Sequence, residues 1–418
     1  MVAIVRKSSQ NEDVRIAVVG AGPAGAALSL LLARGGAEVL LVERETDFER
    51  VFRGEGLMPL GLEMLHQMGF RERLRELPGD TLDAWDIHLN RTRVMHIEEP
   101  SRALGDLALR IVSQTALLSS LIDEAKKHPG FVFRPGTSVR DLRRDGDRVV
   151  GLRLSTPAGE ETLAADLVIG TDGRASVIRK RAGLELRLLN ESYDVLWFKL
   201  PLPKVLEGTN PIQIFASGPD AMLAYRSWDG RWQLAWMLRK GGWRSARERD
   251  WLAECAALLP EYLGEHLLSH RDALVGPSLL DVMVGRCPRW HAPGLLLLGD
   301  AAHPMSPIRA QGINMALRDA VVAANHLVPT LRAGGDVDAA LAAIQREREP
   351  EIAKAQKLQY REARGQRWAR ERPWLMKPML ALVPWMMRSD AIRGFLQNAW
   401  LRQQRPLRMG IVDVRLRV

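Results

Sequence analysis

The sequence contains little cysteine and no long apolar run. Two cysteines in 418 residues, Cys255 and Cys287, exclude a disulfide framework and a cysteine-based metal site. No apolar run reaches the roughly 18 residues that a membrane-spanning helix needs, and the first residues lack the apolar core of a signal peptide. We therefore expect a cytoplasmic protein in a reducing compartment that binds no metal.

Aromatic residues are also sparse, at 6% of the chain, while 46% of the residues are hydrophobic and 26% are charged. This balance is typical of a folded globular protein, and the length predicts two or three domains. The net charge of +9 favours anionic partners such as phosphorylated cofactors. Because no nucleic-acid motif accompanies the charge, we expect no nucleic-acid partner. The composition leaves the oligomeric state open.

The most informative stretch lies between Val14 and Glu43. An apolar run leads into the glycine-rich turn GAGPAG, which is followed by a small-residue helical pattern and a second apolar run that ends at an acidic residue. A strand, glycine-rich turn, helix and strand in this order bind a dinucleotide. The stretch therefore predicts an α/β fold with a Rossmann-like domain.

Each residue of the turn has a physical role in that prediction. Gly20 makes the tight turn, Gly22 lets the backbone approach a pyrophosphate, and Gly25 lets the helix pack closely on the strand. The pyrophosphate would lie at the positive end of the helix dipole, beside Ala24. Glu43 can accept hydrogen bonds from an adenosine ribose.

Two arginines follow this unit. Arg44 comes directly after the acidic residue, and we expect it at the cofactor. Arg53 lies in the segment RGEG, where a cation among glycines can reach a cofactor phosphate or a substrate; the alternative is a solvated loop arginine.

Two helices are predicted after these arginines. Pro59 begins the first helix, and Gln114 opens the second, which has one apolar face.

Residues 192–285 have the pattern of a separate, sheet-rich unit. Alternating apolar residues predict several strands, and Trp228 to Arg231 predict a two-residue hairpin turn. Trp232 and Trp236 then share one face of a strand with Leu234 and Leu238. This face either lines an aromatic substrate pocket or forms core between the sheet and the next element.

Two further strands stop at an acidic residue. The first ends at Asp172-Gly173, and the second, a run of four leucines, ends at Gly299-Asp300. A carboxylate just beyond a strand can accept hydrogen bonds from ligand hydroxyls. A proline-containing loop and the N-terminus of a helix follow the second strand, and the dipole of that helix can stabilise an electron-rich group.

The C-terminal part differs in composition. Residues 336–370 are charged and helical in pattern, with Pro350 as a predicted break. Residues 373–400 are apolar, basic and aromatic, and their prolines exclude one spanning helix. This segment either makes peripheral contact with a membrane surface or packs over the cofactor domain.

Three motifs now stand in the order seen in flavoprotein aromatic hydroxylases. They are GAGPAG at 20–25, TDGRASVIRK at 171–180 and GDAAHPMSPIRAQGIN at 299–314. The chain resembles the single-component, class A family of para-hydroxybenzoate hydroxylase over about residues 1–330. The resemblance implies an FAD-binding domain, an interleaved β-sheet substrate domain and a helical C-terminal region.

By this resemblance the cofactor is FAD and the reductant is NADPH or NADH. Glu43 would bind the ribose, Asp300 the ribityl chain, and the backbone at residues 311–314 would face the flavin. Asp172 and Gly173 would serve both FAD and the docking of NAD(P)H. The predicted cofactor-binding residues are Gly20, Gly22, Ala24, Gly25, Glu43, Arg44, Arg53, Gln114, Asp172, Gly173, Gly299, Asp300, Pro307, Gly312, Ile313 and Asn314.

The implied reaction is a monooxygenation. NAD(P)H reduces FAD, O2 adds at flavin C4a, and the hydroperoxide transfers oxygen to an aromatic, quinol or other electron-rich substrate by hydroxylation or epoxidation. The predicted catalytic residues are Arg53, Pro307 and Arg309. Arg309 departs from the family pattern, which usually has small residues or glycines there, and it either binds an acidic group or points outward.

The implied FAD-binding domain comprises residues 1–80, 104–185 and 286–335, and the substrate domain comprises 81–103 and 186–285. Residues 336–418 form the helical region.

Three other functions compete with this interpretation. A flavin-dependent halogenase would show a Gly-Trp-x-Trp-x-Ile-Pro stretch, which the chain lacks. A reductase of a lipophilic, polyprenyl-type substrate and a flavin-binding scaffold with little turnover both stay open.

Overall fold

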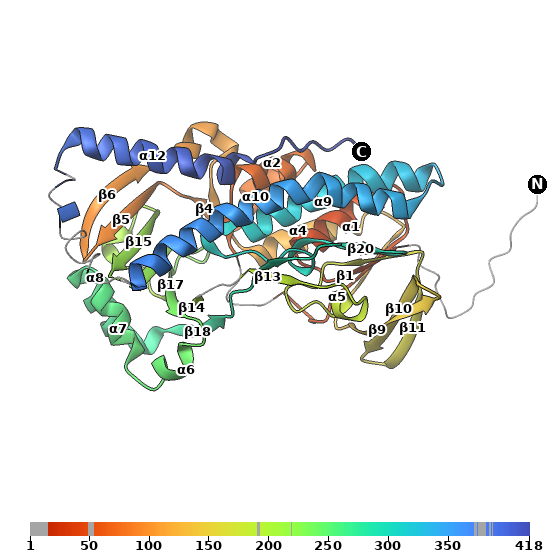
Figure 1. Ribbon diagram of the computed structural model, residues 1–418, viewed down its shortest axis with the longest axis horizontal. Helices are drawn as coiled ribbons and strands as arrows, with labels where there is room; N and C mark the ends of the chain where they lie inside the picture. Colours follow the sequence, from red (N-terminus) through yellow and green to blue (C-terminus); the bar gives the residue numbers. More distant parts are fainter. Residues whose placement is uncertain are drawn as a thin grey trace, which may run out of the picture.

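The computed structural model describes residues 16–48, 54–189, 193–218, 220–371, 374, 382–383, 386 and 388–418. It is a mixed α/β protein built on two large sheets, one toward each end of the long axis (Figure 1). This arrangement confirms the predicted fold class.

The first large sheet has six strands in the order β20-β21-β12-β1-β2-β8. Its central strands are parallel, and Ile16 pairs with Val39 on one side and with Leu167 on the other. Parallel strands need helical crossovers, as the glycine-rich unit predicted. The strands are β1 (Ile16–Val19), β2 (Val39–Val42), β8 (Phe131–Arg134), β12 (Leu167–Gly170), β20 (His291–Ala292) and β21 (Leu295–Leu297).

Alternating residues of this sheet pack into two different layers. Ile16 and Val18 pack with the helices α1 (Pro23–Arg34), α4 (Gln114–Ala125) and α9 (Gln311–Arg332). Ala17 and Val19 face the three-stranded sheet of β9 (Ser138–Asp145), β10 (Arg148–Thr156) and β11 (Gly159–Ala164). The six-stranded sheet is therefore buried on both faces, which explains its apolar strands.

The second large sheet has seven strands in the order β18-β14-β17-β16-β15-β5-β6. It joins strands from two distant parts of the sequence, since β15 pairs in parallel with β5. The strands are β5 (Ala84–Leu89), β6 (Thr92–Glu98), β14 (Tyr193–Leu200), β15 (Pro211–Ser217), β16 (Asp220–Arg226), β17 (Trp232–Arg239) and β18 (Val275–Leu280).

The hairpin between β16 and β17 differs from the prediction. Ser227 N–H bonds Arg231 O at 2.8 Å, and Gly230 N–H bonds Ser227 O at 3.0 Å. Gly230 has φ +78°, so the loop is a turn closed by a left-handed residue and has three residues rather than two. The two-residue prediction was wrong because the loop contains one more residue, which the alternation of apolar residues in the strands does not reveal.

The tryptophan face of β17 forms core. Trp232, Leu234, Trp236 and Leu238 pack in one apolar cluster with the helices α7 (Trp251–Leu258) and α8 (Glu261–Ser269). This decides between the two alternatives for that face, and the opposite face of the sheet is the one that lines a cavity.

The smaller elements connect these layers. The short strands are β3 (Gly56–Leu57), β4 (Gly79–Thr81), β7 (Arg110–Val112), β13 (Arg187–Leu189) and β19 (Val284–Arg286), and the short helices are α2 (Pro59–Gln67), α3 (Arg71–Glu76), α5 (Val177–Arg181) and α6 (Trp243–Ala246). Segments of 3-10 helix span Pro100–Leu107, Lys204–Leu206, Arg271–Ala273, Gly299–Ala301 and Ile308–Ala310.

The C-terminal region consists of α10 (Val337–Glu371), α12 (Asp390–Met409) and an extended tail. Helix α10 runs through Pro350 without ending, so the predicted break was wrong. The residues on either side of this proline, Arg348 and Glu351, lie in buried ion pairs with α9, and this packing outweighs the lost backbone hydrogen bond.

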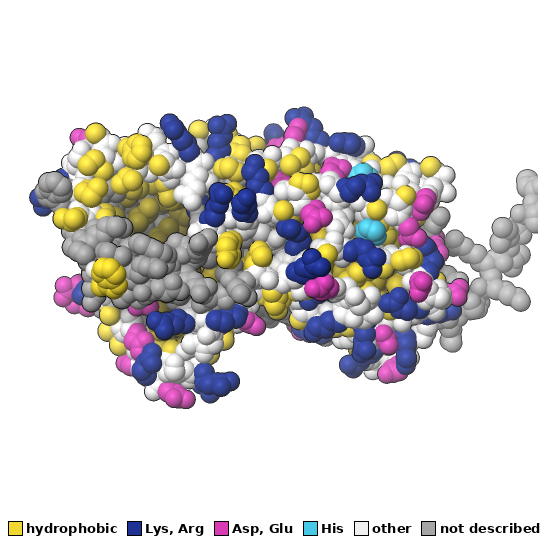
Figure 2. Space-filling model, in the orientation of Figure 1, with side chains coloured by type: hydrophobic (Ala, Val, Ile, Leu, Met, Phe, Trp, Pro, Cys, Tyr) yellow, Lys and Arg dark blue, Asp and Glu magenta, His cyan; other side chains and the backbone are white. Residues whose placement is uncertain are grey.

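The described part of residues 373–400 packs on the protein through α12. This helix lies against α2 and β6, above the seven-stranded sheet in Figure 1. Among the described residues, no helix is long and apolar enough to cross a membrane. Figure 2 shows basic and acidic side chains interspersed on one face of the molecule, which agrees with a diffuse positive charge.

Candidate functional site

A single cavity of about 1450 Å³ connects the glycine-rich turn to the seven-stranded sheet. All three motifs contribute to its wall, although they are far apart in the sequence. Of the described predicted residues, Gly25 and Asn314 lie outside the lining, and Arg53 falls outside the described part of the chain. The predicted residues in the lining are Gly20, Gly22, Ala24, Glu43, Arg44, Gln114, Asp172, Gly173, Gly299, Asp300, Pro307, Arg309, Gly312 and Ile313.

The glycine-rich turn has the geometry that its sequence predicts. Gly20 has φ +100°, a conformation that favours glycine. A Cβ on Gly25 would overlap the carbonyl oxygen of Gly20 and lie 2.6 Å from Thr171 Oγ1, which confirms its packing role. A Cβ on Gly22 would meet no described atom within 4 Å, and the N-terminus of α1 carries no side-chain cap there. This open space at a helix N-terminus fits a pyrophosphate.

Glu43 stands at the end of β2 and faces the turn. Its carboxylate accepts hydrogen bonds from Ala21 N–H at 2.8 Å and from Glu45 N–H at 3.1 Å. Arg44 is exposed and pairs with Glu45 at 2.6 Å. The Glu43 carboxylate therefore already accepts hydrogen bonds from the protein backbone. An adenosine ribose would bind to this same carboxylate.

Asp172 caps a helix in addition to lining the cavity. Its carboxylate accepts hydrogen bonds from Val177 N–H at 2.6 Å and Ile178 N–H at 3.1 Å, at the start of α5. Burial raises the pKa of Asp172 above its ordinary value, against the lowering effect of these hydrogen bonds. Arg174, from the same motif, forms an ion pair with Asp300 at 3.1 Å. Arg174 was not among the predicted site residues, although it lies within the second motif.

The loop of the third motif is held by a buried ion-pair network. Gly299 has φ +58°, and its N–H donates to Asp319 Oδ2 at 3.0 Å. Asp319 also contacts His303 Nε2 at 2.7 Å and Arg348 Nε at 2.7 Å. Burial alone would raise the pKa of Asp319, but His303 and Arg348 outweigh it and hold the pKa at about 2. An ionised Asp319 thus fixes the loop that presents Asp300.

The backbone after Pro307 adopts a conformation that favours glycine. Arg309 has φ +68° and Ala310 has φ +50°, so two residues with side chains adopt the left-handed conformation. Arg309 lies in the cavity wall rather than pointing away from it. Burial, together with the charge of Arg408, lowers the pKa of Arg309 to about 10, so the guanidinium stays positive at neutral pH.

Asn314 supports the cavity from behind. Its buried side chain accepts a hydrogen bond from Met58 N–H at 3.0 Å and donates one to Gly56 O at 3.2 Å. Gln114 donates to Gly54 O at 3.2 Å. These two amides hold the 54–58 segment between α9 and α4, beside the predicted position of the flavin.

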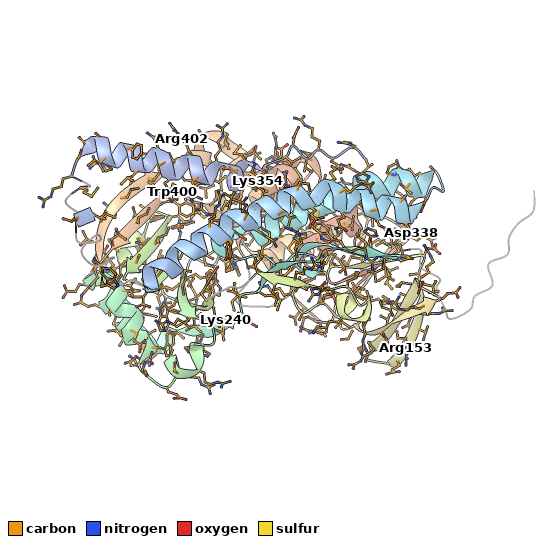
Figure 3. All side chains as sticks on the ribbon, viewed as in Figure 1. Arg153, Lys240, Asp338, Lys354, Trp400 and Arg402 are labelled. Atoms are coloured by element: carbon orange, nitrogen blue, oxygen red, sulfur yellow. The ribbon has the colours of Figure 1, made fainter. Side chains whose placement is uncertain are left out.

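The sheet side of the cavity is mainly apolar and aromatic. Its side chains come from alternate positions of β14 to β17 and from β18, and α12 closes the cavity with Trp400 and Gln404. In Figure 3, Trp400 projects from α12 toward the body of the molecule, whereas Arg402 projects from the opposite side. Trp400 ends the aromatic segment 373–400 of the sequence, whereas no motif indicated Gln404. The apolar side chains of the sheet wall include Trp197, Ile212, Ile214, Leu223 and Met237.

Comparisons with known proteins agree with this geometry. A family model described as "FAD binding domain" matches residues 13–358. The chain is 35% identical over 401 residues to 6-methylpretetramide 4-monooxygenase from Streptomyces rimosus, covering 94% of this chain and 93% of that protein. It is 27% identical over 361 residues to 3-hydroxybenzoate 6-hydroxylase from Klebsiella oxytoca, covering 82% and 86%.

A solved structure shares the fold. The crystal structure of p-nitrophenol 4-monooxygenase PnpA from Pseudomonas putida DLL-E4 superposes with a TM-score of 0.75 at 18% identity, covering 96% of this chain and 99% of that one. The named relatives are hydroxylases and monooxygenases, which supports the monooxygenase function and neither a polyprenyl reductase nor a scaffold. The cofactor is FAD and the reductant is NAD(P)H. The chain belongs to the FAD-binding-domain family, as an FAD-dependent monooxygenase of the aromatic hydroxylase type.

Proposed function

We propose that this monooxygenase hydroxylates a phenolic substrate with two or more fused rings. The observation that carries the proposal is the continuous cavity of about 1450 Å³ between the glycine-rich turn and the seven-stranded sheet. Sites for one small ligand usually measure about 300–1,000 Å³, so the space suits a dinucleotide and a sizeable substrate together. A relative named for a pretetramide supports a multi-ring substrate.

The cofactor would lie along the wall made by the three motifs. Gly20, Gly22 and Ala24 would hold the pyrophosphate at the N-terminus of α1, and Glu43 the adenosine ribose. Asp300 would hold the ribityl chain. When bound, FAD would accept electrons from NAD(P)H and use them to activate O2.

The protein's own residues position the substrate and exclude water. The apolar side chains of the sheet face would bind the rings, and Trp400 would close the cavity over them. Arg309 would attract an anionic substrate or cofactor group, Pro307 would shape the oxygen site with its backbone, and Arg53 would contact a phosphate. Both NADH and NADPH fit the proposal.

The proposed domain boundaries follow from the same division. Residues 1–80, 104–185 and 286–335 would form the FAD-binding domain, and 81–103 with 186–285 the substrate domain. The membership of β5 and β6 in the seven-stranded sheet supports the interleaving. Residues 336–418 would cover both, because α12 contacts α2 and β6. We favour this packing over membrane contact for residues 373–400.

The test is product analysis under labelled oxygen. The FAD-loaded protein is incubated with NADH or NADPH, ¹⁸O2 and phenols of two to four fused rings, beginning with 1-naphthol. We expect one ¹⁸O atom in the product and pyridine-nucleotide oxidation that the phenol accelerates. Oxidation that leaves every phenol unlabelled would refute the proposed function.

A further inference from the structure

A buried cluster of charged side chains lies beside the cavity. Lys199 Nζ is 3.2 Å from Glu55 Oε1 and 3.0 Å from Asp229 Oδ2. The Ser227 hydroxyl donates to Glu55 Oε2 at 2.8 Å and accepts from Lys199 Nζ at 2.7 Å. The side chains of Glu55 and Lys199 are each 2% exposed, whereas that of Asp229 is 26% exposed. The cluster therefore runs from the interior to the surface.

The cluster joins the two sides of the cavity. Glu55 and its neighbours Gly54 and Gly56 line the cavity from the cofactor side. Lys199 lies two residues after Trp197 on β14, so both side chains project from the same face of the sheet. Because Trp197 lines the cavity, the buried ammonium group lies on the substrate side.

The charges of the cluster make it a proton acceptor. One ammonium and two carboxylates carry a net charge of −1 when all are ionised. Burial raises the pKa of Glu55 to about 7, although Lys199 and Ser227 lower it, and the charge of Asp229 raises it further. Tyr225 also lines the cavity, but burial raises its pKa well above the ordinary value, so it stays protonated. Glu55 is thus the member of the cluster that exchanges a proton near neutral pH.

We propose that Glu55 is the general base that removes the proton from the substrate's phenolic hydroxyl, and that Lys199 and Asp229 pass this proton to solvent. The proposal rests on the proposed function. The phenolic O–H bond breaks, its electron pair stays on the phenolic oxygen, and the proton forms an O–H bond with Glu55. Lys199 then takes this proton while it releases another to Asp229, whose carboxyl reaches water.

The step has a clear chemical purpose. A phenolate donates more electron density into its ring than a phenol does, so it reacts faster with an electrophilic oxygen. An aromatic amine has an electron-donating lone pair without losing a proton. The two substrate types therefore separate a proton-transfer role of Glu55 from a structural one.

The experiment compares 1-naphthol with 1-naphthylamine, which has nearly the same shape. The rate of hydroxylation by the FAD-loaded protein is measured from pH 5 to 9 by product mass spectrometry, for the natural chain and Glu55→Gln. The control is Glu254→Gln, the same change in an exposed pair with Arg249. General base catalysis contributes about 10²–10⁴-fold.

We expect the naphthol rate of the natural chain to rise with pH through about 7. Glu55→Gln should lower this rate by about 100-fold or more and remove the pH step, while the naphthylamine rate and the control variant change less than about threefold. An equal loss with both substrates, or a pH step that persists in Glu55→Gln, would refute the base role while the proposed function stands. Failure of the natural chain to oxygenate either compound would refute both proposals.

Asp229→Asn tests the cluster without removing Glu55. Because the Asp229 charge raises the pKa of Glu55, this variant should move the pH step to lower pH. An unchanged step would contradict the proposal, even if Glu55→Gln does not fold.

Discussion

Removing Asp319 tests whether the buried ion-pair network holds the third motif in place. The side chains of Asp319 and Arg348 are at most 1% exposed, and Asp319 is 2.7 Å from Arg348 Nε. Asp319→Ala would leave the Arg348 charge with Glu351 alone, and the N–H of Gly299 would lose its acceptor. Breaking a buried pair by removing one partner costs about 3–5 kcal/mol, a large part of the about 5–15 kcal/mol that stabilises a typical protein.

The assay is urea unfolding followed by circular dichroism, with FAD retention measured in parallel. Asp319→Ala should lower the unfolding midpoint strongly and weaken FAD binding, because the loop that presents Asp300 loses its support. The matched control is Asp413→Ala, whose exposed pair with Arg415 should leave the midpoint nearly unchanged. A destabilisation below about 1 kcal/mol, against the 3–5 kcal/mol expected for a buried pair, would refute the reasoning.

Three further predictions concern backbone and burial. Gly25→Ala should destabilise the protein by about 1–3 kcal/mol, because its Cβ would overlap Gly20 O. Gly22→Ala should leave the stability unchanged but lower the affinity for FAD. Urea unfolding measures the stability of both variants, and FAD titration measures their affinity. Ala310→Gly should raise stability by about 1 kcal/mol, since φ is +50° there, and an unchanged unfolding midpoint would contradict this. Burial lowers the pKa of His88 to about 4, so between pH 6.5 and 4 the unfolded chain binds more protons than the folded chain, and stability is lost as the pH falls through this range. His88→Asn should make the unfolding midpoint less dependent on pH there.

The sequence predicted those parts of the site that depend on local geometry. Gly20 needs a positive φ and Gly25 a close approach of helix and strand, and both needs follow from the spacing of the turn. The order of the motifs then implied that distant segments meet, and their residues do line one cavity.

The remaining features depend on packing between distant elements. The tryptophans of β17 share one face in the sequence, but only α7 and α8 determine that this face is core. Helix α10 continues through Pro350 because buried charges of α9 hold it. Glu55 and Lys199 are 144 positions apart, and nothing in their local sequence indicates an ion pair.

The central claim is that the cavity holds FAD as a working redox cofactor. The visible spectrum of the purified protein, recorded in air before and after the addition of NADPH or NADH, tests this claim most directly. We predict flavin bands that bleach with the pyridine nucleotide and return as O2 reoxidises the flavin. A protein without flavin bands, even after incubation with FAD, would contradict the account.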